Sequence, residues 1–489
     1  MNPVGKEAAA CAIRVIIPFY RTPKLVAPLF RSLLNCASEL NELGCTVVAV
    51  NDSVDDAPMG KLLRQYVAEL NSKTPCILQT NEVNLGFVKT MNASMRGAIS
   101  DGCDVLLLNS DTVVFPGAFR EMVRVSQLDS MIAFVSPRSN NATICTFPPL
   151  PEIPLAGPEY SHQVFSELRE YLPDFHYVPT AVGFCLWIRR TVLKEIGLFD
   201  EEYGKGYNEE NDLMMRANRL GYRAVLANWA FVHHLGEQSF SASDVPKVIH
   251  DTRNSALLAS RYPEYLEHVQ AWFSGPLYEA ERLVSGFLTD AEGRMDIVFD
   301  CTQFGKYHNG TFNAARRVIE EAARTWTDRF NIFVIANSEA ATFHEFHTIP
   351  GVMVVPPDTN QVFAAAFRFG QPFSRDAILR MSRIAPVNVY AMLDTIAWDC
   401  LYLNRDGLDE LWRTVAQYAD GLLYISDFNQ DQFRHRFDIR QGMPEQVAIF
   451  RSILRNICFR SGIPMLLAPI TWLSEMRLRT SMLHRPLRS

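Results

Sequence analysis

The sequence predicts an α/β protein with a mostly parallel sheet and helices on both of its faces, followed by a second, incomplete unit of the same class. Two observations carry this prediction. Short apolar runs alternate with helical patterns through the first half of the chain, and the runs are continuously apolar, as in strands buried on both faces. A second series of the same kind begins at Met295. A chain of 489 residues is long enough for two or three domains.

The first series supplies the strands and helices of the larger predicted domain, residues 1–285. The predicted strands are Ile13–Ile17, Thr46–Val50, Cys76–Leu78, Val105–Leu108 and Ile132–Val135. The predicted helices are Pro23–Leu43 and Gly60–Asn71, and a helical stretch near Tyr265–Phe287 closes the domain. The prolines between Pro148 and Pro158 predict an irregular loop within the first domain and not a domain boundary, because the α/β pattern resumes at Val182.

The second series predicts another domain with alternating strands and helices, of the Rossmann-like kind, over residues 295–450. Its predicted strands are Ile297–Phe299, Ile332–Ile335, Val352–Val355, Val387–Tyr390 and Leu422–Ile425. Residues 451–489 form an atypical basic tail with seven arginines and one glutamate. Two hypotheses account for this tail: contact with an anionic membrane surface, or a slip of the reading frame.

Composition limits the class of protein. The net charge of −7 gives no dominant basic surface, so we expect no nucleic-acid partner. The ten cysteines contain no CxxC pair and predict reduced, buried thiols of a cytosolic protein. No signal-peptide pattern and no run of transmembrane length occurs. We therefore expect a cytoplasmic protein, with peripheral contact to the inner face of the membrane as the one alternative.

Polar side chains follow the predicted strands of the first domain. The first strand ends in Pro18-Phe19-Tyr20-Arg21, the second in Asn51-Asp52-Ser53 and the fourth in Asn109-Ser110-Asp111. Ligands of parallel sheets bind at these carboxyl ends, and clustered carboxylates suit Mg²⁺ or Mn²⁺ bridging a diphosphate. The alternative is that these residues are ordinary turn formers.

A second group of candidates lies further along the chain. Glu209, Glu210 and Asp212 fall in the first turn of a predicted helix that Asn208 would cap. Such carboxylates either favour the helix dipole or supply a general base. The pair His233-His234 closes an apolar strand and is either structural or a source of a metal ligand.

Seven motifs, in this order, resemble those of the inverting family 2 glycosyltransferases of the GT-A fold, over residues 11 to about 240. They are VIIPFYRT, VNDSVDD, NLGFVKTMNASMRGA (Asn84 to Ala98), Asn109-Ser110-Asp111, GFCLWIRRTVLKEIGLFDEEY (Gly183 to Tyr203), NEENDLMMR and FVHH. The chain departs from the family pattern where Asn51 and Asn109 replace carboxylates and where Glu210 replaces an aspartate.

The resemblance implies roles for the candidate residues. Asp52 would contact the nucleotide base, within a nucleotide-binding set of Pro18, Tyr20, Asp52, Asn84 and Gly86. Asp111 would hold Mg²⁺ or Mn²⁺, with Asn109 at the weaker end and His233 completing the site, and His234 as the fallback. Glu210 would be the general base, with Glu209 and Asp212 as competitors for that role.

Helix geometry favours Glu210 among the three carboxylates. Glu210 lies three residues before Leu213 and seven before Ala217, which define the apolar face, so it should point inward. Asp212 is expected to cap the helix or to bind an arginine or backbone group nearby.

Residues 295–450 resemble the N-terminal, acceptor-side half of a family 4 glycosyltransferase of the GT-B fold. The motifs are VFDCTQFGKYHNGTFNAARRVIEEA, VYAMLDTIAWD and ADGLLYISDFNQDQF. Since such enzymes bind the donor in a second Rossmann-like domain, we expect this unit to be inactive as a transferase.

The sequence thus predicts a transferase that moves a sugar from a nucleotide sugar to a glycan or lipid-linked acceptor, in the synthesis of bacterial surface polysaccharides as the resemblance implies. Two alternatives stay open. A sugar nucleotidyltransferase would want a glycine-rich basic loop after the first strand, where this chain has Pro18-Phe19-Tyr20-Arg21-Thr22. A non-catalytic protein that binds nucleotide sugars or carbohydrates would carry the same sheet without turnover.

Overall fold

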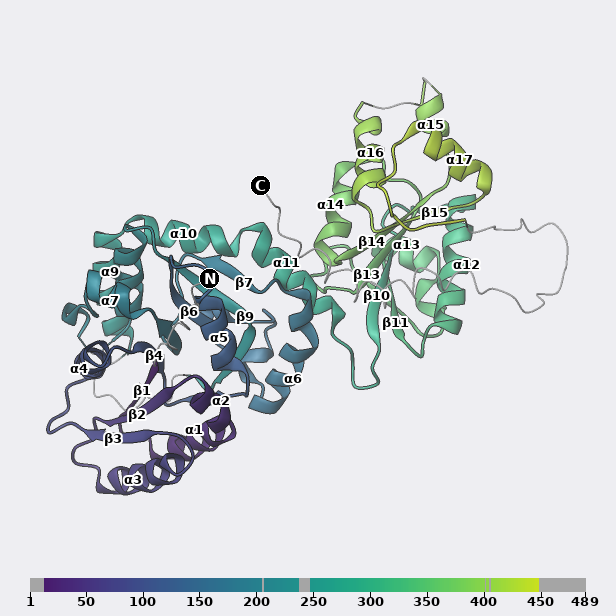
Figure 1. The fold of residues 1–489 in the computed structure, drawn as a ribbon. Helices are drawn as coiled ribbons and strands as arrows, with labels where there is room; N and C mark the ends of the chain where they lie inside the picture. The colour runs from purple at the N-terminus through teal and green to yellow at the C-terminus, as the bar shows by residue number, and fades with distance from the viewer. Residues whose placement is uncertain (1–12, 205, 237–246, 401, 404–405, 448–489) are drawn as a thin grey trace, which may run out of the picture. The chain divides into compact units, whose positions relative to one another are not determined.

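The computed structural model describes residues 13–204, 206–236, 247–400, 402–403 and 406–447. It divides into two compact units, Met1–Tyr278 and Glu279–Ser489 (Figure 1). The predicted basic tail at 451–489, with its proposed membrane contact, lies outside the described residues. Within the described part of the chain, no helix has the length and apolar character needed to cross a bilayer.

The first unit is built on one mixed sheet whose order is β3-β2-β1-β4-β8-β6-β9-β5, with β7 also paired to β9. The strands β1 to β4 are mutually parallel where they pair, and β8 runs antiparallel to both of its neighbours. This confirms the predicted α/β fold with a largely parallel sheet. The strands are β1 Ile13–Phe19, β2 Cys45–Asn51, β3 Cys76–Thr80, β4 Asp104–Leu108, β5 Thr112–Val114, β6 Ile132–Arg138, β7 Phe175–Val178, β8 Cys185–Ile188 and β9 Arg223–His234.

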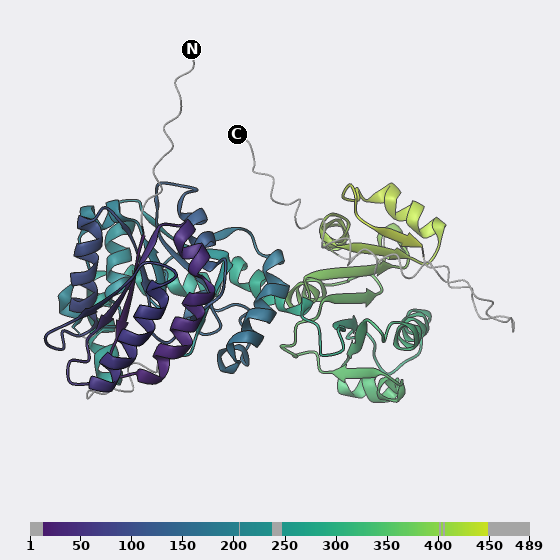
Figure 2. The ribbon, with the colours of Figure 1, turned by 60° about the horizontal axis from the view of Figure 1, so that its bottom comes forward.

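Helices cover both faces of this sheet (Figure 2). One group, α1 to α3 with α5, packs together, and a second group is formed by α4, α7 and α8. The change of side occurs because the chain passes from β1 outward to β3 and then returns to place β4 on the other side of β1. The carboxyl ends of the neighbouring strands β1 and β4 therefore form the topological switch point, where ligands of such sheets bind. The helices are α1 Pro23–Asn35, α2 Ala37–Glu42, α3 Ala57–Asn71, α4 Phe87–Ser100, α5 Ala118–Ser126, α6 Pro158–Leu168, α7 Arg190–Ile196, α8 Glu209–Asn218, α9 Lys247–Arg261, α10 Glu264–Phe273 and α11 Pro276–Val284.

The predicted helix Pro23–Leu43 is two helices, broken at Cys36. The N–H of Cys36 bonds to the carbonyl of Leu33 at 3.0 Å, which tightens the last turn of α1 and lets α2 leave in a new direction. The short helix α2 places the side chain of Glu39 at the start of α5. The Glu39 carboxylate accepts from the N–H groups of Gly117 at 2.7 Å and Arg120 at 2.6 Å.

Replacing Glu39 by alanine should destabilise the first unit by about 2 kcal/mol, because two helix N–H groups next to a buried position would lose their acceptor. The measurement is chemical denaturation followed by circular dichroism. Glu42 is the matched control on the same helix, since its exposed carboxylate contacts the exposed side chains of Arg120 and Ser38. Equal denaturation midpoints for Glu39→Ala and Glu42→Ala would contradict this role of Glu39.

The second unit is a wholly parallel sheet of order β12-β11-β10-β13-β14-β15-β16. Its two faces hold separate cores: Ile297 and Phe299 of β10 face one core, and Val298 faces the other. Burial on both faces explains why its strands are continuously apolar. The strands are β10 Met295–Asp300, β11 Phe330–Ile335, β12 Val352–Val355, β13 Ala365–Phe369, β14 Val387–Met392, β15 Gly421–Tyr424 and β16 Glu445–Val447. The helices are α12 Gly310–Thr325, α13 Ser338–Phe343, α14 Arg375–Ile384, α15 Ile396–Asp399, α16 Leu408–Tyr418 and α17 Asp427–Arg436.

Candidate functional site

The end of β1 is held in an unusual backbone conformation. Arg21 has φ of 49°, in the left-handed region that non-glycine residues rarely occupy, and its N–H donates to the Ser53 hydroxyl at 2.7 Å. The guanidinium of Arg21 lies over the half-buried ring of Tyr20, 5.3 Å from its centroid. Such strain persists only where the surroundings enforce it, and it concentrates at functional sites. The predicted residues Pro18 and Tyr20 thus lie at the switch point.

Asp52 organises the turn before α4. One of its carboxylate oxygens accepts from the Asn81 amide at 2.7 Å and the Leu85 N–H at 2.9 Å, and the other accepts from the Gly86 N–H at 2.9 Å. Gly86 has φ of 75°, which favours glycine, and it begins α4. Asn84 lies exposed in the same turn, its side-chain oxygen 2.9 Å from the Gly86 nitrogen. The structure therefore brings Asp52, Asn84 and Gly86 together, with the Asp52 carboxylate already bound to protein donors.

Asp111 lies beside His234. It is buried, and its Oδ2 is 3.5 Å from the Nε2 of His234. In the pairing of β5 with β9, Thr112 stands opposite His234 and Val113 opposite His233. Because successive side chains of a strand point to opposite faces, His233 and His234 face opposite sides of β9. The ring that the structure places beside Asp111 is that of His234, the fallback residue of the prediction, while His233 was its first choice.

His233 has a different environment. Its ring is buried, and its Nδ1 has no hydrogen-bond partner among the described residues. Burial, helped by the neighbouring His234, lowers the pKa of His233 to about 4, although Glu159 opposes the shift. His233 is therefore a neutral ring packed into the interior.

The pair Asp111–His234 has the chemistry of a cation site. The Nδ1 of His234 lies 2.7 Å from the carbonyl oxygen of Asn141, and a carbonyl can only accept, so Nδ1 carries the proton of a neutral ring. Nε2 then presents its lone pair toward Asp111, and the Asp111 Oδ1 is buried with no hydrogen-bond partner in the described part of the chain. A histidine fixed through its other nitrogen beside an unsatisfied carboxylate fits a divalent ion.

The protein supplies few ligands for such an ion. Among the described residues, no group of three His, Cys, Asp or Glu side chains is placed to hold a metal. Asn109, the third predicted ligand, is anchored through its backbone: its N–H donates to Phe184 at 2.8 Å and its carbonyl accepts from Thr112 at 2.8 Å. Mg²⁺ is commonly held by one or two protein groups together with phosphate and water, so the pair fits an ion that arrives with a diphosphate.

The first turn of α8 buries two carboxyl groups together. Glu209 is 5% exposed, and the Oε2 atoms of Glu209 and Glu210 are both buried without hydrogen-bond partners in the described part of the chain. The Glu210 side chain lies against Gly183, at 3.7 Å from where a Cβ would stand. Glu210 is half-buried, whereas Glu209 and Asp212 are buried, so an inward direction does not single out Glu210 among the three carboxylates. Helical spacing allows the burial of Glu209, because Glu209 lies four residues before Leu213 and eight before Ala217 and so shares their face.

Burial raises the pKa of both glutamates. For Glu209 the shift is large, and the charge of Glu210 adds to it. For Glu210 backbone N–H groups at the start of the helix and the contact with Glu209 oppose the rise. One carboxyl of the pair thus stays protonated where an ordinary glutamate is ionised, and the other is the stronger candidate for a base. Tyr265 of α10 is close enough that burial and the charge of Glu210 raise its pKa as well.

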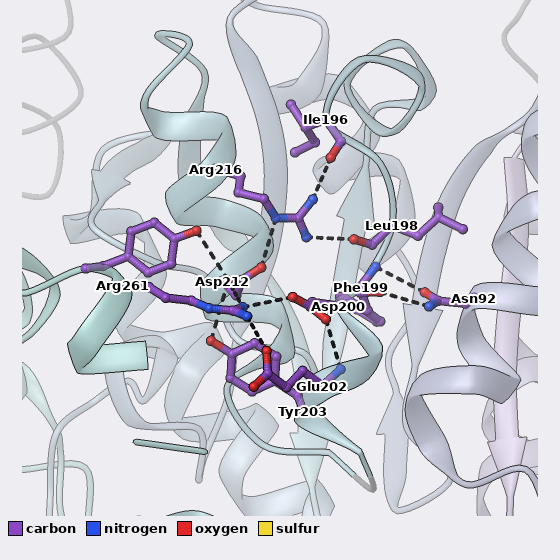
Figure 3. A network of polar contacts seen from close by, with 11 residues as sticks. Asn92, Ile196, Leu198, Phe199, Asp200, Glu202, Tyr203, Asp212, Arg216 and Arg261 are labelled. Carbon is purple, nitrogen blue, oxygen red and sulfur yellow. Dashed lines mark hydrogen bonds and ion pairs between the residues drawn. The ribbon is translucent and has the colours of Figure 1, made fainter. Parts of the chain in front are cut away.

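Asp212, the third predicted carboxylate, is bound on both sides (Figure 3). Its Oδ2 accepts from Arg216 at 2.8 Å, and its Oδ1 accepts from Arg261 at 3.1 Å and the Tyr262 hydroxyl at 3.3 Å. This agrees with the expected arginine contact, and both oxygens of Asp212 are bound by protein donors. Sequence reasoning missed Arg261 and Tyr265, because nothing local marks a residue whose partners lie about 50 positions away.

The family model described as "Glycosyltransferase like family 2" matches residues 10–247. A comparison with curated proteins found no match.

Several solved structures are similar to about half of the chain. The mannosyltransferase PcManGT from Pyrobaculum calidifontis, solved in complex with GDP-Man and Mn2+, is 16% identical over 54% of this chain and 74% of its own, with a TM-score of 0.35. GalNAc-T7, solved with UDP, GalNAc and Mn2+, is 14% identical over 56% of this chain and 52% of its own, with a TM-score of 0.37. TarS 1-349 of S. aureus is 16% identical over 56% of this chain and 78% of its own, with a TM-score of 0.32.

The matched segment contains the switch-point residues, the pair Asp111–His234 and the two glutamates of α8. The family model matches residues 10–247, a little under half of the chain.

Proposed function

We propose that this protein transfers a sugar from a nucleoside diphosphate sugar to a hydroxyl group of a glycan or lipid-linked acceptor, with inversion at the anomeric carbon. One observation carries the proposal: a single family 2-like domain holds both a cation-ready pair, Asp111–His234, and a buried pair of glutamates at the start of α8.

The donor side of the site is the switch point between β1 and β4. Asp111 and His234 would hold Mg²⁺ or Mn²⁺, which would neutralise charge on the departing diphosphate. The turn held by Asp52 stands at the end of the neighbouring strand β2 and, with Tyr20, would orient the nucleotide. The backbone strain at Arg21 fixes the direction in which the chain leaves β1.

The acceptor side is the first turn of α8. The ionised member of the glutamate pair, which we assign to Glu210, takes the proton of the acceptor hydroxyl as that oxygen attacks the anomeric carbon. Glu209 keeps its proton because its pKa is raised further by burial and by the charge of Glu210. A carboxylate that acts as a base on the acceptor hydroxyl implies one displacement, and hence inversion.

The second unit is proposed to assist acceptor binding without transferring sugar itself. Its support is the resemblance to the acceptor-side half of a GT-B enzyme, together with the parallel sheet that this half requires. Surface polysaccharides of bacteria remain the proposed products.

The test is release of nucleoside diphosphate from a panel of UDP-glucose, UDP-N-acetylglucosamine, GDP-mannose and dTDP-rhamnose, each assayed with Mn²⁺ and with excess chelator. We expect at least one donor to be turned over with the metal and not with the chelator. Binding of these donors without turnover would point to a non-catalytic binding protein. Formation of a nucleotide sugar from a nucleoside triphosphate and a sugar phosphate would point to a nucleotidyltransferase.

A further inference from the structure

Arg261, the last residue of α9, gathers three carboxylates from two separate segments (Figure 3). One terminal nitrogen lies 2.9 Å from Asp200 and 3.1 Å from Asp212, and the other lies 2.5 Å from Glu202. Its guanidinium also lies over the ring of Tyr203, 5.6 Å from the centroid. Arg261 is therefore a clamp between α8 and the segment Asp200–Tyr203.

The α8 end of this clamp leads to the proposed base. Asp212 lies two positions after Glu210 in the same helical turn, so a shift of Asp212 moves the glutamate pair with it. Arg216 holds the same carboxylate and also donates to the carbonyl oxygens of Ile196 and Leu198, each at 2.6 Å. The start of α8 is thus fixed against the end of α7 by one arginine and against Asp200–Tyr203 by the other.

The other end of the clamp leads to the donor side. Asp200 follows Phe199, whose backbone exchanges two hydrogen bonds with the Asn92 side chain of α4, at 2.9 and 3.1 Å. Helix α4 begins at the turn that Asp52 holds through Gly86. One continuous set of contacts therefore joins the nucleotide-side turn to the helix that carries the glutamates.

We propose that Arg261 is a positioning residue for Glu210: it holds the first turn of α8 at the distance from the donor site that transfer requires. This inference rests on the proposed function. Without Arg261, the three carboxylates lose the cation that they share, while Asp212 keeps Arg216 and the Tyr262 hydroxyl, and repulsion among the carboxylates would separate α8 from the Asp200–Tyr203 segment. A displacement of about 1 Å of a reacting group can cost about 100-fold in rate.

The test compares Arg261→Gln and Arg261→Lys with the control Arg124→Gln. Arg124 also bonds two carboxylates, Glu121 and Asp174, but it lies on α5 and does not contact α8. With UDP-glucose or whichever panel donor is turned over fastest, both Arg261 variants should lose about 10- to 100-fold in kcat with little change in the KM for donor. Lysine should fail as well, because one ammonium cannot span the geometry of the guanidinium fork. The control should keep wild-type kcat, and melting curves should show all three variants folded at the assay temperature.

A double-mutant cycle separates positioning from a general structural loss. If Arg261 acts through Glu210, Arg261→Gln should lower kcat in the wild-type background and leave the residual rate of Glu210→Gln unchanged. Equal losses in both backgrounds, or wild-type kcat in folded Arg261→Gln, would overturn the inference while leaving the proposed function intact. Full activity of Glu210→Gln alone would instead refute the base assignment on which the inference depends.

Discussion

Glu210→Gln should lower kcat by about 100-fold or more, with little change in the KM for donor. Glutamine keeps the shape of the side chain and its contact with Gly183, but it cannot take a proton from the acceptor. The donor site is built from β1, β2, β4 and β9, which this change does not touch. The measurement is steady-state kinetics with the donor that the panel identifies.

Glu209→Gln is the matched comparison for Glu210→Gln, and its expected effect is on the pH dependence of kcat. Burial raises the pKa of Glu210, so activity that needs its ionised form should fall away at a higher pH than for an exposed glutamate. The titratable groups that face Glu210 are Glu209 on its own helix and Tyr265 on α10. Glutamine at position 209 cannot ionise, so the acid limb of the plot of kcat against pH should follow the titration of one group instead of two. The value of kcat at the alkaline plateau should stay unchanged. Loss of activity in Glu209→Gln, with Glu210→Gln near wild type, would move the base to Glu209.

Asp111→Asn should abolish metal-dependent turnover while the protein remains folded. The change removes the charge from an almost isosteric side chain whose Oδ1 has no hydrogen-bond partner among the described residues, so the fold loses little. A loss of about 1000-fold is expected, since the diphosphate would depart without compensation of its charge. Activity is measured across a Mn²⁺ titration, and melting curves check the fold.

The two histidines provide an internal control for this prediction. His234→Gln should weaken the dependence on Mn²⁺, because only His234 lies beside Asp111. His233→Gln should leave the Mn²⁺ dependence unchanged, because His233 points to the other face of β9. Full activity of Asp111→Asn, or of the wild type in excess chelator, would remove the metal assignment.

The sequence predicts those strands and helices that a pattern of neighbouring apolar residues marks. The strands β1, β2, β4 and β6 are buried and β3 is largely exposed, and the apolar runs predict each of the five within a few residues. The strand β5 is three residues long, and β13 lies in an alanine- and phenylalanine-rich stretch, so neither was predicted. The break at Cys36 was missed because the apolar spacing continues across it.

The candidate site could be predicted in part for the same reason. Residues directly after strands, such as Asp52 and Asp111, could be placed at one sheet edge by topology alone. The choice between His233 and His234 needed the spatial position of Asp111, which precedes β5 and lies beside His234, and the sequence does not state that position. The clamp at Arg261 depends on partners in other elements, and no spacing within α9 indicates it.

The central claim, that one carboxylate base activates the acceptor for a single displacement, is tested most directly by the configuration of the sugar released. With an α-linked donor such as UDP-glucose and water as acceptor, ¹H NMR recorded before mutarotation should show the β-anomer first. Initial appearance of the α-anomer would require two displacements or a front-side attack, and would contradict the role assigned to Glu210.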